Sequence, residues 1–192
     1  QYDLALADYR EAMQILVDLE ISIPARLQEA LKQGQNAIMV GNKDQAEENF
    51  LIALAINGTN EEARQGLDRS LKLDEVINLT ALGVTSEDQG KWQEAMQSFT
   101  NALIIDSEWI GAVDGLARST KAFEAEEYQR LLSLSYQLIK EAKFDEARSA
   151  LEQATALQPD SVQVAQAFEE LGLQERMAKI KALKYEALSA EV

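Results

Sequence analysis

The sequence of 192 residues contains neither histidine nor cysteine. Their absence excludes Ser-His-Asp and Cys-His catalysis, HExxH zinc sites and every reaction that uses imidazole as an acid or base. It also disfavours zinc, which proteins bind mainly through these two residue types. Carboxylates are abundant, but among 33 acidic residues Asp and Glu pairs arise by chance. We therefore expect no enzyme activity, no metal and no cofactor.

Proline and aromatic residues are scarce, with two prolines and 6% aromatic residues in the whole chain. The scarcity of proline permits long helices almost everywhere. A composition rich in alanine and leucine but poor in aromatic residues favours closely packed helices over a β-sandwich. The composition therefore predicts an all-α fold.

Basic residues are in the minority, because 18 Lys and Arg stand against 33 Asp and Glu, for a formal net charge of −15. Such a surface repels phosphate backbones and anionic membranes, so we expect no nucleic-acid partner. No apolar run is long enough to span a bilayer, and membrane attachment would need an anchor outside this chain. The chain starts at Gln1 rather than Met, which suggests that an upstream segment was removed.

Three segments, residues 44–56, 92–105 and 144–157, repeat one pattern of side-chain sizes. Each has a small residue, a large apolar residue four positions later, an alanine three positions further and an aliphatic residue after three more. This spacing places the four side chains on one face of an α-helix. The sets are Ala46, Phe50, Ala53 and Ile56; Ala95, Phe99, Ala102 and Ile105; and Ala147, Leu151, Ala154 and Leu157.

A turn and another predicted helix precede each of these segments. The turns are predicted at Gly41-Asn42, Gly90-Lys91 and Ala142-Lys143. A small residue occupies the same place in each preceding helix, and a breaker follows each segment; the small residues are Gly34, Gly83 and Ser135, and the breakers are Gly58, Ser107 and Pro159. Small residues let two helix axes approach to about 8–10 Å. The sequence therefore predicts three helix–turn–helix hairpins.

These residues resemble the tetratricopeptide repeat (TPR) over most of residues 26–160. The second hairpin matches its pattern of small residue, turn glycine, aromatic residue, Ala, Phe and Ala through Gly83, Gly90, Trp92, Ala95, Phe99 and Ala102. The resemblance implies TPR-like helix–turn–helix repeats stacked in an α-solenoid. It also implies that ligands, typically proteins or peptides, lie on the concave surface that the first helix of each hairpin lines.

The repeats are longer than the usual 34 residues of that family. Ala46, Ala95 and Ala147 are 49 and 52 positions apart, and extra helix is predicted after each hairpin. We expect one helix over residues 60–89 and another over about 107–142, which makes a more open array with long helices between repeats. The predicted units are an N-terminal amphipathic helix, 1–23, and three repeat units, 24–74, 75–126 and 127–192.

The two ends of the chain carry amphipathic patterns of their own. Near the N-terminus, apolar residues recur at steps of three and four, with Glu20 as an interruption: Leu6, Tyr9, Met13, Leu16 and Ile23. This helix either packs on the first hairpin or mediates self-association as a coiled coil. Ser22-Ile23-Pro24 predicts a helix stop and restart. The C-terminal cations Arg176, Lys179, Lys181 and Lys184 are expected on a solvated helix face.

The positions that line the concave surface in the resembled family form a largely apolar strip with polar edges. This strip suits an amphipathic helix or an extended apolar peptide, unless the extra helices of the chain cover it. The candidate partner-binding residues are Leu31, Gln35, Ile38, Met39, Ile77, Val84, Glu87, Gln129, Leu132, Tyr136 and Ile139.

Two functions follow as hypotheses. The first is a non-catalytic protein–protein interaction scaffold that binds a peptide or helix on this surface. The alternative is an architectural spacer, or a self-associating arm with homo-oligomer contacts through residues 1–23. The layout also resembles bacterial envelope proteins in which a membrane anchor precedes lengthened repeats, which implies a periplasmic location; a cytoplasmic location is the alternative.

Overall fold

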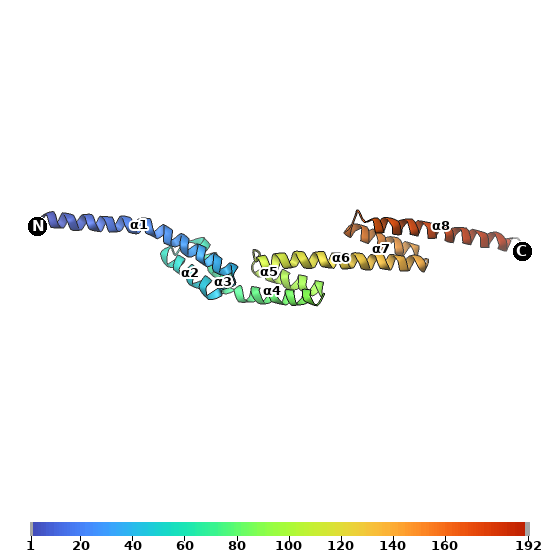
Figure 1. The fold of residues 1–192 in the computed structure, drawn as a ribbon, viewed down its shortest axis with the longest axis horizontal. Coiled ribbons are helices and arrows are strands. Elements are labelled where there is room, and N and C mark those ends of the chain that lie inside the picture. Colours follow the sequence, from blue (N-terminus) through green and yellow to red (C-terminus); the bar gives the residue numbers. More distant parts are fainter. Residues whose placement is uncertain (1, 191–192) are drawn as a thin grey trace. The chain divides into compact units, whose positions relative to one another are not determined.

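The computed structural model describes residues 2–190, and their side chains except at 2–10, 21, 188 and 190. These residues form eight helices, as the composition predicts (Figure 1). The helices are α1 (Tyr2–Met39), α2 (Lys43–Ile56), α3 (Glu61–Leu71), α4 (Leu73–Asp88), α5 (Trp92–Ile105), α6 (Ile110–Lys140), α7 (Phe144–Leu157) and α8 (Val162–Ala190). Helices that follow one another in sequence pack antiparallel. They form two compact units, of which the first ends at Leu116 and the second begins at Ala117.

The three predicted hairpin turns are confirmed at the expected residues. In each, one residue takes a left-handed conformation: Gly41 with φ 76°, Gly90 with φ 69° and Ala142 with φ 59°. Two backbone hydrogen bonds close the first turn, from the Asn42 N–H to the Ala37 carbonyl at 2.8 Å and from the Gly41 N–H to the Ile38 carbonyl at 2.9 Å. The same pair recurs in the other two turns. This is the Schellman motif, which satisfies the last carbonyls of a helix.

The helices that follow these turns, α2, α5 and α7, have 14 residues each. The first three residues of each predicted four-residue set are fully buried: Ala46, Phe50, Ala53, Ala95, Phe99, Ala102, Ala147, Leu151 and Ala154. The small residues of the preceding helices leave space for these large side chains. A Cβ added at Gly34 would lie 2.8 Å from the Phe50 ring, and one added at Gly83 would lie 2.6 Å from the Phe99 ring.

A second glycine faces each ring from the helix that follows. Gly66 of α3 contacts Phe50, and Gly115 of α6 contacts Phe99, again with no room for a Cβ. Each aromatic ring is thus held between two glycines, 16 positions before and 16 positions after it. The equivalent positions in the last repeat hold Ser135, Leu151 and Ala167, where a smaller central side chain accompanies two larger neighbours.

The buried side chains form three hydrophobic clusters. The first cluster gathers residues of α1, α2, α3 and the start of α4, and the second gathers residues of α4, α5 and the first turns of α6. Trp109 packs against both, and so joins them within one unit. The third cluster gathers residues of α6, α7 and α8 from Tyr128 to Leu171 in the other unit. α6 therefore supplies residues to both units.

Pro24 lies inside α1, which runs without a break from Tyr2 to Met39. The predicted helix stop and restart at residues 22–24 is therefore wrong. A proline removes one backbone N–H and crowds the carbonyl four residues earlier, here that of Glu20. Glu20, Ile23 and Pro24 are exposed, so water can hydrate the carbonyl that loses its partner.

The prediction of a single helix over residues 60–89 is also wrong, because the helix is interrupted at Lys72. α3 ends at Leu71 and α4 begins at Leu73, with Lys72 at φ −98° and ψ −1° between them. The break brings Leu73 and Ile77 onto the first cluster. The long helix expected over about 107–142 is confirmed as α6, with 31 residues. No helix in the described part of the chain combines the length and apolar character that a bilayer-spanning segment needs.

Candidate functional site

The structure separates the eleven predicted partner-binding residues into two groups. Four of them are buried in the hydrophobic clusters: Leu31, Ile38, Leu132 and Ile139. Gln35, Met39, Val84, Gln129 and Tyr136 are exposed, and Ile77 and Glu87 are partly buried. The added helices cover these four residues, since Ala63 of α3 shares the first cluster and Val164 of α8 shares the third.

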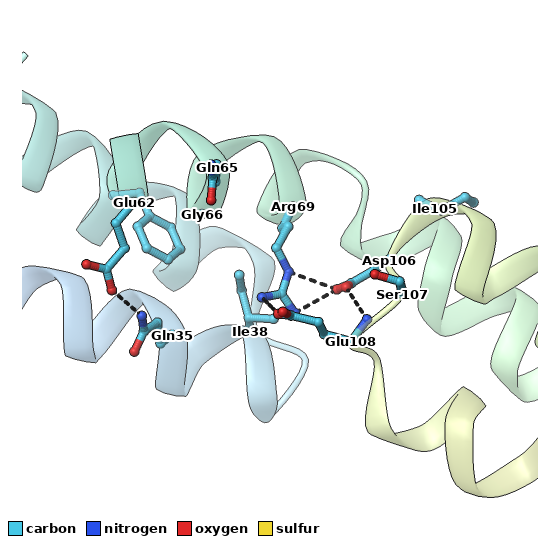
Figure 2. A pocket seen from close by; sticks show the side chains of 11 residues that line it. Gln35, Ile38, Glu62, Gln65, Gly66, Arg69, Ile105, Asp106, Ser107 and Glu108 are labelled. Atoms are coloured by element: carbon cyan, nitrogen blue, oxygen red, sulfur yellow. Dashed lines mark hydrogen bonds and ion pairs between the residues drawn. The ribbon is translucent and has the colours of Figure 1, made fainter. Parts of the chain in front are cut away.

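A cleft of about 350 Å³ lies in the unit that ends at Leu116. It opens between α1, α3 and the turn that joins α5 to α6 (Figure 2). Gln35 and Ile38, two of the predicted residues, belong to its lining. The complete lining is Gln35, Ile38, Phe50, Glu62, Gln65, Gly66, Arg69, Ile105, Asp106, Ser107 and Glu108.

Arg69 of α3 determines how this cleft is built. Its Nη2 lies 2.9 Å and its Nε 3.1 Å from Oδ2 of Asp106, and its Nη1 lies 2.8 Å from Oε2 of Glu108 (Figure 2). The Asp106 side chain is 6% exposed, and its Oδ1 accepts a hydrogen bond from the Glu108 N–H at 3.1 Å. The guanidinium group thus ties the end of α3 to the turn before α6. Because a buried carboxylate without a cation is costly, this pair keeps the turn in place.

The rim of the cleft is acidic and forms hydrogen bonds. The Gln35 amide donates to Glu62 Oε1 across the cleft, from α1 to α3 (Figure 2). Glu62 and Glu108 are exposed carboxylates, and the lining holds three carboxylates against one cation, Arg69, which pairs with two of them. The apolar lining residues Ile38 and Phe50 are almost fully buried. The excess of negative charge attracts a cation to the rim.

A second groove, of about 470 Å³, lies in the unit that begins at Ala117. Its walls come from the end of α6, the start of α7 and the middle of α8, and its apolar residues include Ile139, Phe144 and Met177. Lys140 and Lys181 stand at its edge. Its charge is therefore opposite to that of the first cleft. Among the side chains that the structure describes, no group of three or more acidic residues is placed to hold a metal ion.

Arg69, Asp106 and Glu108 were not predicted from the sequence. Arg69 and Asp106 are 37 positions apart, and neither belongs to the repeated pattern. One signal was available, since Asp106 follows a predicted helix directly and precedes another, where a carboxylate often caps the next helix. The partner of that carboxylate depends on how α3 packs, which the periodicity does not show.

The fold and the cleft define an all-helical protein of sequentially packed antiparallel helices, described over residues 2–190, with an acidic cleft in one unit. Comparisons with known proteins found no matching family model, no matching curated protein and no matching solved structure. The function is therefore argued from the residues of the chain alone.

Proposed function

We propose that this chain is a non-catalytic scaffold of lengthened TPR-like repeats that binds a basic segment of another protein in the acidic cleft. Three features support the repeat assignment: three hairpins with the same internal spacing, a Schellman turn in each, and a central residue held between small residues 16 positions away on both sides. Repeats of this kind stack side by side and offer extended surfaces to partners.

The charge of the cleft is the observation that carries the choice of partner. Glu62 and Glu108 are exposed carboxylates of the cleft, and Arg69, which pairs with Asp106 and Glu108, is one cation among three carboxylates of the lining. A Lys or Arg side chain of a peptide would place its charge beside the two exposed carboxylates. The net charge of −15 would speed the approach of a basic segment.

Fluorescence anisotropy with short labelled peptides tests this proposal. Peptides that contain one central Lys or Arg with apolar neighbours should bind, and binding should weaken with salt. Glu62→Gln and Glu108→Gln should each reduce the affinity about 5-fold, which corresponds to roughly 1 kcal/mol for an exposed charged pair. Glu152→Gln serves as the matched control, because Glu152 is an exposed helical glutamate of α7, outside the cleft.

The proposal is wrong if neither cleft variant changes the affinity or if peptides with a central Glu bind equally well. Tighter binding of acidic peptides would instead favour the second groove, where Lys140 and Lys181 stand. A Lys181→Glu variant would then lose that binding. Each outcome therefore assigns the peptide to one groove or to neither.

A second candidate function is an architectural spacer or self-associating arm, and the exposed apolar side chains of α1, among them Met13, Leu16 and Ile23, favour it. The resemblance to anchored envelope proteins supports a periplasmic place for this chain. An apolar stretch of about 20 residues in a longer form of the protein would support that location.

A further inference from the structure

Both α1 and α8 extend beyond the hydrophobic clusters and expose apolar side chains there. Leu27 is the first residue of α1 that packs on the first cluster, and Leu171 is the last residue of α8 buried in the third. Among the side chains that the structure describes, the large exposed apolar residues before Leu27 are Met13, Ile15, Leu16, Val17, Leu19 and Ile23, and those after Leu171 include Leu173, Met177, Ile180, Leu183 and Tyr185. Exposed apolar stripes of this extent mark interaction surfaces.

In α1, a seam of four residues follows the steps three, four and three: Met13, Leu16, Glu20 and Ile23. The three apolar side chains are 44%, 53% and 47% exposed. This is the spacing of alternating a and d positions in a coiled coil, with Met13 and Glu20 at a. An acidic residue therefore stands in the middle of an otherwise apolar seam.

The exposed part of α8 repeats the same steps in Met177, Ile180, Lys184 and Ala187. All four are exposed. The seam again has Met at the first a position and an interruption at the second, but here the interrupting charge is positive. Its last position is a small apolar residue, where α1 has the large Ile23. Aligned in parallel, the two seams set apolar residues against apolar residues, and Glu20 lies opposite Lys184.

We propose that α8 of one copy of this chain pairs in parallel with α1 of a second copy. The layers of this coiled coil are Met13 with Met177, Leu16 with Ile180, Glu20 with Lys184, and Ile23 with Ala187. In a parallel pair, residues at a face each other across the seam, so the two interrupting charges meet. A paired charge at one a position fixes register and partner choice at some cost in stability.

Pairing of like ends is disfavoured by the same residues. Two α1 helices in register would place Glu20 against Glu20, and two α8 helices would place Lys184 against Lys184. Either pairing would bury two like charges in a seam, which costs more than an exposed repulsion. Two α8 helices would also set Ala187 against Ala187 and leave that layer underfilled, whereas Ile23 fills it. The contact therefore joins unlike ends, and a contact of this kind either continues from copy to copy as an open chain or closes into a ring.

The paired segments leave room for the folded clusters. In this register Leu171 of one copy and Leu27 of the other stand about 20 residues apart, which is about 30 Å at 1.5 Å per residue. α8 runs toward the first cluster of the other copy and reaches Ile23 with Ala187, before that cluster begins at Leu27. The clusters therefore do not overlap along the shared helix pair.

This inference rests on the self-associating role proposed above and is independent of peptide binding in the cleft. Sedimentation equilibrium of the full chain tests it first. The mean mass should rise above the monomer mass of 21.3 kDa with concentration, as an open series of copies or as a closed ring. A strict monomer would remove both the self-associating role and this inference. Association that neither charge reversal described below weakens would remove only this inference.

Charge reversal provides the sharper test. Glu20→Lys and Lys184→Glu each place like charges opposite one another, and each variant alone should be monomeric. An equimolar mixture of the two variants, or one chain that carries both changes, should associate as the parent does. Asp18→Lys and Lys179→Glu are matched controls, because these exposed residues lie outside the two seams. Association unchanged by either seam variant, or not restored by mixing, would overturn the pairing.

Disulfide trapping tests the register. Because the chain has no native cysteine, only the introduced cysteines can form disulfides. Chains with Leu16→Cys mixed with chains with Ile180→Cys should form a mixed disulfide, whereas Asp18→Cys with Ile180→Cys should not. Disulfides between two Leu16→Cys chains would indicate α1 pairing instead. A single chain with both cysteines that cross-links as a monomer would indicate that α8 contacts its own α1. Either of these two results would overturn the proposal.

Discussion

Gly83→Ala is the substitution that best tests how the repeats are packed. Gly83 lies buried in α4, and an added Cβ would stand 2.6 to 2.8 Å from three carbons of the Phe99 ring. The ring is fully buried and is blocked on its other side by Gly115. It therefore cannot rotate away from the new methyl group.

Two opposing terms set the size of the effect. Overpacking of this kind costs roughly 1–3 kcal/mol, whereas alanine in a helix interior gains about 1 kcal/mol over glycine. Ala81→Gly measures the second term separately, because Ala81 is exposed in the same helix. After correction by that control, we expect Gly83→Ala to lower the free energy of unfolding by roughly 1–3 kcal/mol.

The last repeat shows how the clash should be relieved. Its equivalent positions combine Ser135 with Leu151, so a smaller central side chain accompanies a larger neighbour. Phe99→Leu alone should cost roughly 1–2 kcal/mol through lost burial and a cavity. Together, Gly83→Ala and Phe99→Leu should cost at least about 1 kcal/mol less than the sum of the two single changes.

Tryptophan fluorescence during urea unfolding is a suitable assay. The chain has two tryptophans, Trp92 and Trp109, which flank the ends of α5, and Trp109 packs on the second cluster that contains Phe99. The signal therefore reports on the repeat that is changed. Costs that add within about 0.5 kcal/mol would refute the claim that Gly83 and Phe99 are coupled by contact.

Three further predictions concern turns and charges. Ala142 holds a left-handed position that glycine holds in the other two turns, so Ala142→Gly should raise the free energy of unfolding by roughly 0.5–1 kcal/mol; a loss on urea titration would contradict this. Arg69→Met leaves the Asp106 carboxylate buried without its cation and should cost about 1.5–3 kcal/mol. Adding Asp106→Asn should recover most of that loss, and full additivity of the two changes would argue against the pair. The hydrogen bond from Lys143 lowers the pKa of Glu141 below its ordinary value of 4.5, so this contribution to stability is present above that value and is lost as the pH falls through the lowered pKa. Carboxyl NMR titration should show the low pKa, and Lys143→Met should raise it toward the ordinary value.

The hairpins could be predicted from the sequence because their packing is local and periodic. Ala46, Phe50 and Ala53 pack on the helix that precedes them across a single hairpin turn. Gly41, whose conformation is left-handed, marks that turn in the sequence. Each of these features recurs three times, which separates them from chance. α6 was predicted on another ground, because no proline lies between Ile110 and Lys140.

The partner-binding surface could not be predicted as well, because it depends on which helix covers which face. Leu31 and Ile38 read as exposed groove residues only if no third helix packs on them, and α3 and the start of α4 do. Pro24 was misread because a proline inside a helix costs about 3 kcal/mol, yet on this exposed stretch water can hydrate the carbonyl that loses its partner. The ion pair of Arg69 with Asp106 joins two residues whose separation in sequence does not follow the spacing of the repeats. A periodic pattern therefore cannot predict it.

α6 has a practical consequence for any attempt to study the two units apart. The boundary between Leu116 and Ala117 falls inside this continuous helix rather than in a loop. A truncation there would leave Ala112 on a frayed helical end in one fragment and would remove the leading turns of the same helix from the other. Limited proteolysis should accordingly spare this boundary. A fragment of the first unit should run on to Lys140, and a fragment of the second unit should begin between Ile105 and Ile110, so that each keeps α6 whole.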